Sequence, residues 1–155
     1  MAGSAIHGVV VTPLSIIRDG RGAVMHMLRA DAPHFTAFGE IYFTTVDPGA
    51  VKAWKRHREM TLNLCCVVGT VRLALFDDRD GSATRGAVQE IVLSPDVVAA
   101  YCLVTVPPGI WTGFACAGDT PALMANCASL PHDPTEADGL PAETGRIPYH
   151  WPART

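Results

Sequence analysis

The sequence predicts an all-β fold, a single jelly-roll barrel domain over residues 1–155 with a C-terminal arm. Short runs rich in β-branched and aromatic residues recur at regular spacing between Gly and Pro turns, and helical periodicity is almost absent. Two stretches, residues 47–71 and 107–114, each contain a Pro-Gly turn followed by a Trp. Such a pair of stretches indicates two halves of one small barrel.

The expected strands are separated by clear breakers. Thr12-Pro13 ends the first strand, Pro48-Gly49 follows the third, and Pro107-Pro108-Gly109 stops a later one. Gly69 interrupts a long β-rich run and indicates a tight turn or bulge between two strands. The expected strand regions are residues 6–11, 23–29, 38–46, 62–76 (divided at Gly69), 88–93, 101–106, 110–116 and 121–128.

A Pro-rich, acidic tail, residues 131–155, follows the last expected strand. Its closing run from Ile147 to Pro152 is apolar and aromatic, and we expect it to pack against the barrel as an arm. The polar 135–145 segment is expected to be the most mobile part of the chain.

Composition excludes several functional classes. A hydrophobic fraction of 48% and a charged fraction of 17% indicate a globular protein. The formal net charge of -3 gives no electrostatic footprint for nucleic acid, and no apolar run is long enough to span a membrane. No signal peptide is recognisable and the five cysteines form no CxxC pair, so we expect buried thiols in a reducing, cytoplasmic location.

A metal site is not expected, although a jelly roll with two Pro-Gly elements resembles the cupins. Their metal site needs an H-x-H pair, a later carboxylate and a His in the second half of the barrel. Counted back from Gly69, the pair falls on Lys55 and His57 and the carboxylate on Leu62, while the second-half His falls on Thr112. A lone imidazole does not hold a metal against water, which disfavours a metal-dependent oxygenase and predicts no cofactor.

Proton chemistry remains open to a barrel without a metal. Lys55 and His57 are two residues apart, so on a strand they share one face, while Lys52, Trp54 and Arg56 share the other. If the first face is interior, an imidazole suited to general-base work lies beside an ammonium that favours its neutral form and offsets an anion on the substrate. The alternative is a surface His beside a basic turn.

Other polar and aromatic side chains admit both a structural and a functional interpretation. His26 and Glu40 lie in β-rich runs, where a polar group needs a partner, so a core polar pair is the simpler account. Further residues could contact a ligand or could equally be solvated or packed. These are Arg21, Arg29, Lys52, Trp54, Arg72, Trp111 and Asn126.

A series of short motifs runs through nearly the whole chain. In order, these are Arg21-Gly22, the 38–43 strand, Lys52-Ala53-Trp54, Val67-Val68-Gly69-Thr70-Val71, Asp77-Asp78-Arg79, Ser82-x-Thr84-x-Gly86, the run from Pro107 to Phe114, and Ile147-Pro148-Tyr149-x-Trp151. From about Ile6 to Trp151 the chain resembles the dTDP-4-dehydrorhamnose 3,5-epimerase family.

The resemblance implies a metal-free cupin jelly roll, a homodimer and a nucleotide-linked 4-keto-6-deoxy sugar as substrate. It also implies a role in deoxysugar and polysaccharide biosynthesis. In that chemistry the 4-ketone acidifies the hydrogens on C3 and C5. A His base removes one, a basic residue stabilises the enolate, and a Tyr on the opposite face returns a proton.

Carried over residue by residue, the family's R-G-L-H run aligns with Lys52-Ala53-Trp54-Lys55, so Lys55 holds the usual position of the catalytic His. The second-half His position is Thr112, the Tyr position is Ala125, and the acidic position after the Arg-Gly turn is His26.

The resemblance therefore implies a rearranged site, with His57 and Lys55 as base and with Tyr42 or His26 as the source of the other proton. The main hypothesis is an epimerase acting at C3, C5 or both. The alternative is a ketoisomerase or a non-catalytic sugar-nucleotide-binding protein. The expected substrate-binding residues are Arg21, His26, Glu40, Lys52, Trp54, Trp111, Thr112 and Asn126.

Overall fold

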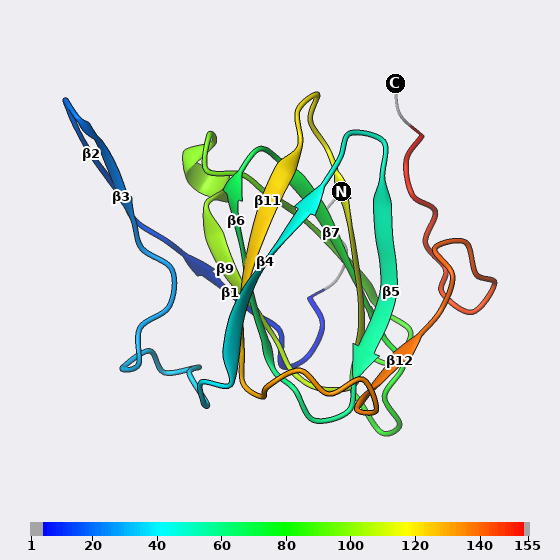
Figure 1. The fold of residues 1–155 in the computed structure, drawn as a ribbon. Coiled ribbons are helices and arrows are strands. Elements are labelled where there is room, and N and C mark those ends of the chain that lie inside the picture. The colour runs from blue at the N-terminus through cyan, green and yellow to red at the C-terminus, as the bar shows by residue number, and fades with distance from the viewer. Residues whose placement is uncertain (1–4, 154–155) are drawn as a thin grey trace.

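In a computed structural model, which describes residues 5–153, the chain forms two five-stranded antiparallel sheets that face each other, and a separate hairpin (Figure 1). The strand orders are β1-β9-β6-β11-β4 and β12-β5-β10-β7-β8. From β4 to β7 the chain changes sheet at every strand, which gives the expected jelly roll. The elements are β1 (Val10–Pro13), β2 (Ile16–Asp19), β3 (Gly22–Met25), β4 (Glu40–Val46), β5 (Val51–His57), β6 (Leu62–Val68), β7 (Val71–Asp77), β8 (Val88–Leu93), the 3-10 turn η1 (Val98–Ala100), β9 (Cys102–Val106), β10 (Ile110–Cys116), β11 (Ala122–Ala128) and β12 (Ala137–Gly139).

The turn at Gly69 confirms the division of the long β-rich run into β6 and β7. Gly69 has a φ of 77°, which L side chains rarely adopt, and a Cβ there would lie 3.0 Å from the Cα of Ala122. The first strand differs from its expected bounds, because it begins at Val10 and continues through Pro13. Pro13 is tolerated because β1 lies at the edge of its sheet, opposite Cys102 of β9.

A hairpin of β2 and β3 replaces the single strand expected over residues 23–29. Asp19 pairs with Gly22 at its tip, and the Asp19 carboxylate accepts hydrogen bonds from the backbone and side chain of Arg21. In Figure 1 this hairpin projects away from both sheets. It carries exposed apolar side chains, among them Ile17 and Val24.

The main core lies between the two sheets. The inward-facing residues of β6, β7 and β9 form it with neighbours from the other strands, and include Leu64, Leu73, Leu75 and Val104. A second cluster gathers around Trp54 and Trp111, with Ala74 and Phe76 of β7 and residues of the tail. Because Ala74 and Phe76 alternate with Leu73 and Leu75, this second cluster covers the outer face of the β5–β10–β7 sheet.

The tail packs along that outer face. Trp54 contacts the rings of Tyr149 and Trp151, at centroid distances of 5.9 and 5.3 Å, and its indole N–H donates to the carbonyl of Ala142. The 135–145 segment, expected to be the most mobile part, contains β12, which pairs with β5 at the edge of the sheet. Between residues 5 and 153, no helix is long and apolar enough to cross a membrane.

Candidate active site

A cavity of about 600 Å³ opens between the sheets. Strands β4, β5, β10 and β11 supply most of its walls, and the tail around β12 closes one side. Leucine, methionine and phenylalanine side chains share the lining with a small set of polar groups. The polar and charged lining residues are Tyr42, Thr44, Lys52, Lys55, His57, Thr112, Asn126, His132 and Asp138.

Strand β5 contributes more residues to this cavity than simple alternation predicts. The pairing of β10 with β5 shifts register between Thr112 and Phe114, which lie opposite Lys55 and Lys52. This irregularity places one extra residue on β5, so Lys52 and Lys55 both line the cavity although they are three residues apart. The sequence-based assignment of Lys52 to the opposite face is therefore wrong, and the bulge is the reason.

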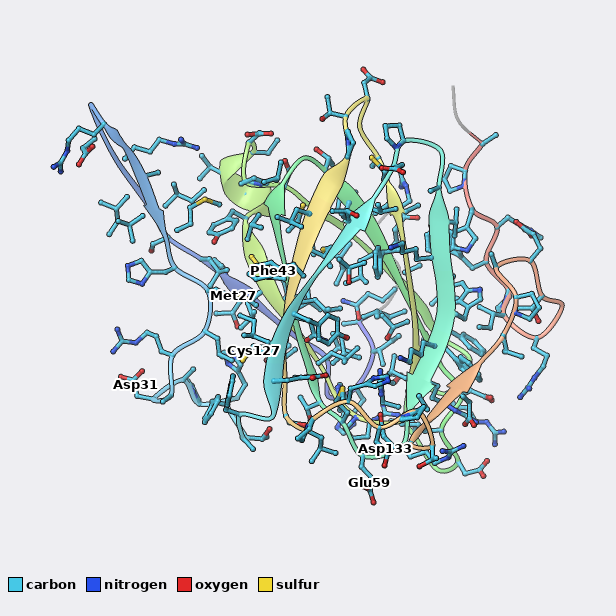
Figure 2. The ribbon with its side chains drawn as sticks, in the orientation of Figure 1. Met27, Asp31, Phe43, Glu59, Cys127 and Asp133 are labelled. Atoms are coloured by element: carbon cyan, nitrogen blue, oxygen red, sulfur yellow. The ribbon has the colours of Figure 1, made fainter. Side chains whose placement is uncertain are left out.

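His57 ends β5 in a buried position and is paired with Glu136 of the tail. The imidazole is 7% exposed and Glu136 is 9% exposed. The Nδ1 of His57 and Oε1 of Glu136 form a short hydrogen bond. The other carboxylate oxygen accepts from the backbone amides of Arg58, Glu59 and Met60. Figure 2 shows Glu59 at the lower end of the barrel, on the loop that surrounds this carboxylate.

These contacts settle which ring nitrogen of His57 carries the proton. Burial acts to raise the pKa of Glu136, but the hydrogen bonds from His57 and from the Glu59 and Met60 amides outweigh it and lower that pKa below its ordinary value. A carboxylate can only accept hydrogen bonds, so the proton lies on Nδ1 of His57. The lone pair is then on Nε2, which has no hydrogen-bond partner within residues 5–153.

The backbone around His57 is also fixed. Its carbonyl accepts a 2.7 Å hydrogen bond from the amide of Gly109, so the Pro-Pro-Gly turn supports the end of β5. On the outer face, Arg56 lies 4.6 Å from the ring centroid of Trp111 and binds Asp138 of β12 at 3.0 Å. These contacts tie β12, and with it Glu136, to the strand that carries His57.

Lys52 and Lys55 are the only lysines of the chain, and both lie exposed in the cavity lining. Within the described residues neither takes part in an ion pair, whereas the neighbouring Arg56 and Arg58 both bind Asp138. Two unpaired ammonium groups beside a base make the cavity favourable for an anionic ligand.

The structure separates the sequence-based site residues into two groups. The cavity brings together Tyr42, Lys52, Trp54, Lys55, His57, Thr112 and Asn126. Outside it lie Arg21, on the hairpin tip, and His26, which lines a second cavity of about 300 Å³ near Leu103. Glu40 starts β4 beyond the lining, and Trp111 is buried under Arg56 on the outer face. Within this chain these four do not reach the site, and the postulated His26–Glu40 core pair does not form among the described residues.

Glu136 was missed by the sequence analysis. It lies in the polar tail, 79 residues beyond His57, and no spacing rule connects the two positions. The sequence contains one weak signal. The closing aromatic run of the tail predicts that the tail docks on the barrel, and docking can place a carboxylate of the tail next to β5. Residues 5–153 contain no group of three or more His, Cys, Asp or Glu side chains placed to hold a metal ion.

Comparison with known proteins identifies the family. No family model matches the chain. The chain is 31% identical over 146 residues to the probable low-salt glycan biosynthesis epimerase Agl13 of Haloferax volcanii, covering 93% of this chain and 88% of that one. It is 44% identical to the crystal structure of a dTDP sugar isomerase from Desulfovibrio desulfuricans G20, with a TM-score of 0.89 over 94% and 92% of the two chains.

The chain belongs to the dTDP-4-dehydrorhamnose 3,5-epimerase family. NovW of Streptomyces spheroides, described as a 4-keto-6-deoxy sugar epimerase, has the same fold with a TM-score of 0.85 at 21% identity, covering 98% of this chain and 78% of its own. In this member of the dTDP-4-dehydrorhamnose 3,5-epimerase family, His57, held by Glu136 behind it, is the cavity residue best suited to proton transfer.

Proposed function

We propose that this protein is a sugar-nucleotide epimerase that acts on a nucleotide-linked 4-keto-6-deoxy sugar in deoxysugar and polysaccharide biosynthesis. The proposal is carried by the His57–Glu136 pair at a cavity that also holds two unpaired lysines. The names of the similar proteins support the substrate class, since they describe a dTDP sugar isomerase and a 4-keto-6-deoxy sugar epimerase.

In this reaction Nε2 of His57 removes a proton from C3 or C5, next to the ketone. The electron pair of that C–H bond moves to the ketone oxygen and forms an enolate. Glu136 stabilises the imidazolium that results, because its carboxylate holds the Nδ1 proton. Lys55 and Lys52 offset the negative charge of the enolate and of the nucleotide diphosphate. Inversion also requires a second group that delivers a proton to the same carbon from the opposite face.

A deuterium exchange experiment tests this function. The protein is incubated in D₂O with dTDP-4-keto-6-deoxyglucose, and ¹H NMR follows the C3 and C5 hydrogens. We expect exchange with the wild type and a loss of roughly 10²-fold or more in His57→Asn. The matched control is His150→Asn, because His150 also lies near a carboxylate, Glu143 at 3.8 Å, but its side chain is 93% exposed on the tail. Absence of exchange with all nucleotide-linked 4-keto-6-deoxy sugars would refute the proposal.

A ketoisomerase or a non-catalytic binding protein is the second candidate, favoured by one observation. Thr112 occupies the second-half His position, and its hydroxyl is buried and directed at the carbonyl of Ile110. The site therefore lacks the imidazole that the family pattern places in the second half of the barrel. Ketone migration along the ring would appear in the same NMR experiment as a new carbonyl position, and pure binding as dTDP affinity without exchange.

We also propose a homodimer. Large apolar side chains are exposed on the outer face of the β1–β4 sheet and on the hairpin, and Figure 2 shows Met27, Phe43 and Cys127 on that same side. Exposed apolar patches of this kind mark interaction sites, and a second copy would cover this one. Phe43→Asp should shift the sedimentation coefficient to that of a monomer, while Val98→Asp, at a 93% exposed position on η1, should not.

A cytoplasmic location is part of the proposal. Cys65, Cys66, Cys102, Cys116 and Cys127 are all free thiols, and most are buried. Thiols that remain unpaired suit a reducing compartment. Quantitative thiol labelling of the unfolded protein, isolated under alkylating conditions from its cells, should find all of them reduced.

A further inference from the structure

Tyr42 lies across the cavity from His57, on the opposite sheet. It belongs to β4, whereas His57 belongs to β5, and both line the same cavity. Ala125, at the position that the resemblance assigns to the family Tyr, alternates with Met124 and Asn126, which line the cavity, so Ala125 faces the other way. His26 is in another cavity. Tyr42 is thus the tyrosine of the cavity lining, and its phenol is far more acidic than the hydroxyls of Thr44 and Thr112 beside it.

The Tyr42 hydroxyl has a fixed partner in Asn126. The two residues lie directly opposite each other in the β4–β11 pair, and the Asn126 amide nitrogen donates to the Tyr42 oxygen at 2.9 Å. The orientation of this amide is unambiguous, because Oδ1 of Asn126 accepts a 3.0 Å hydrogen bond from the backbone N–H of Asn63, which can only donate. The Tyr42 oxygen therefore accepts from Asn126, and its own proton is directed elsewhere.

A buried chain of hydrogen bonds holds this arrangement. Oδ1 of Asn63 accepts from the hydroxyl of Thr105 at 2.8 Å, and its amide donates to the carbonyl of Cys127 at 3.0 Å. Asn63, Asn126 and Thr105 are 1%, 3% and 5% exposed, while Tyr42 is 38% exposed. Buried polar groups are costly unless fully paired, so a chain this complete at the cavity wall fixes the group at its end.

We infer that Asn126, positioned by Asn63 and Thr105, directs the Tyr42 hydroxyl proton into the cavity and makes Tyr42 the proton donor opposite His57. This inference rests on the proposed epimerase function. After His57 has taken the proton from one face, Tyr42 O–H gives its proton to the same carbon from the other face, and the enolate electron pair forms the new C–H bond. The Asn126 amide stabilises the phenolate that is left, and exchange with solvent restores both groups.

The test separates proton removal from inversion. In D₂O, ¹H NMR measures loss of the substrate C–H signal, and product analysis measures inversion. In Tyr42→Phe, His57 still exchanges the proton on its own face, so exchange should remain within about threefold of wild type while inversion falls by roughly 10²-fold or more. The matched control is Tyr149→Phe, whose hydroxyl binds Glu90 away from the cavity and should change neither rate.

Three further variants test positioning by the Asn126 amide and by the hydrogen bonds behind it. Asn126→Asp keeps the acceptor for the Asn63 N–H but offers Tyr42 an acceptor in place of a donor, which turns the hydroxyl proton away from the substrate. It should reproduce the Tyr42→Phe result, with exchange retained and inversion lost. Thr105→Val should reduce inversion more than exchange, and Thr105→Ser should restore it.

Each outcome decides between the hypotheses. Inversion at the wild-type rate in Tyr42→Phe, or equal loss of exchange and inversion in that variant, would overturn the role of Tyr42. Unchanged inversion in Asn126→Asp would overturn the role of the amide. Failure of the wild type to exchange at all would overturn the proposed function, and the present inference with it.

Discussion

His57 and Glu136 form a buried hydrogen-bonded pair although 79 residues separate them in the chain. The carboxylate reaches His57 from the tail and is itself enclosed by backbone amides of the loop that follows β5. This arrangement leaves Nε2 as the free nitrogen at the cavity and keeps the negative charge of Glu136 out of solvent. His57 can therefore accept a proton only at Nε2.

Glu136→Gln should lower kcat by roughly 10²-fold or more with little change in KM. The Gln oxygen can still accept from the backbone amides, so its NH₂ group faces Nδ1 of His57. The imidazole must then carry its proton on Nε2, where it cannot act as a base. Steady-state kinetics on the 4-keto substrate measure this effect. The matched control is Glu143→Gln, on the exposed pair with His150. Equal kcat values for Glu136→Gln and wild type would disprove the role of the pair.

Replacing both Lys52 and Lys55 with Gln should weaken dTDP binding by about tenfold or more, because two unpaired cations no longer face the diphosphate. The loss should shrink at high ionic strength, where the wild-type interaction is itself screened. Isothermal titration calorimetry with dTDP measures the affinity. Arg18→Gln, which removes a charge on the hairpin strand β2, is the control and should bind as wild type does. Unchanged affinity of the double variant would place the anion elsewhere.

The strands were predictable because their signals are local. Gly69, Pro48-Gly49 and the Pro107-Pro108-Gly109 turn each mark a break that the chain makes for steric reasons, and β8 and β10 have the expected bounds. The first strand and the hairpin were less predictable, because pairing with another strand decides their bounds. Pro13 belongs to β1 because it pairs with Cys102 of β9, and Ile16 belongs to β2 because it pairs with Met25 of β3.

The site was predictable only where strand alternation holds. His57 and Lys55 do line one cavity, as their spacing indicates. Lys52 joins them through a bulge, which depends on how β10 pairs with β5 and leaves no trace in β5 itself. Glu136 depends on where the tail docks, which is a long-range packing result. Arg21 illustrates the opposite error, because a motif residue can belong to a projecting hairpin and not to the cavity of its own chain.

Asp77→Asn should lower the free energy of unfolding by about 3 kcal/mol at neutral pH, because it breaks the ion pair between the buried Asp77 carboxylate and the partly exposed Arg79 and weakens the bonds from Ser82 and Thr84. Burial acts to raise the pKa of Asp77, but these hydrogen bonds outweigh it and hold that pKa well below its ordinary value. The folded-state pKa thus lies below the unfolded one.

The contribution of this carboxylate is accordingly complete above roughly pH 5 and is lost as the pH falls toward the folded-state pKa. Urea unfolding at several pH values should show the difference between Asp77→Asn and wild type shrinking in acid. Asp80→Asn, on an exposed carboxylate paired with Arg85, is the control and should show a small difference throughout. A difference for Asp77→Asn that does not depend on pH would contradict the assignment.

Gly113→Ala should lower the midpoint of thermal unfolding by roughly 3–10 °C. A Cβ at this position would lie 2.5 Å from the Cβ of Ala53 and 2.8 Å from Cζ2 of Trp151, closer than packed carbon atoms approach. One neighbour is in the bulge that brings Lys52 into the cavity, and the other belongs to the docked tail. Either the bulge or the tail must move, so KM should rise together with the loss of stability. Gly20→Ala, where a Cβ meets open space, should change neither quantity. If Gly113→Ala melted as the wild type does, the close packing of tail, bulge and β10 would not be required for the folded state.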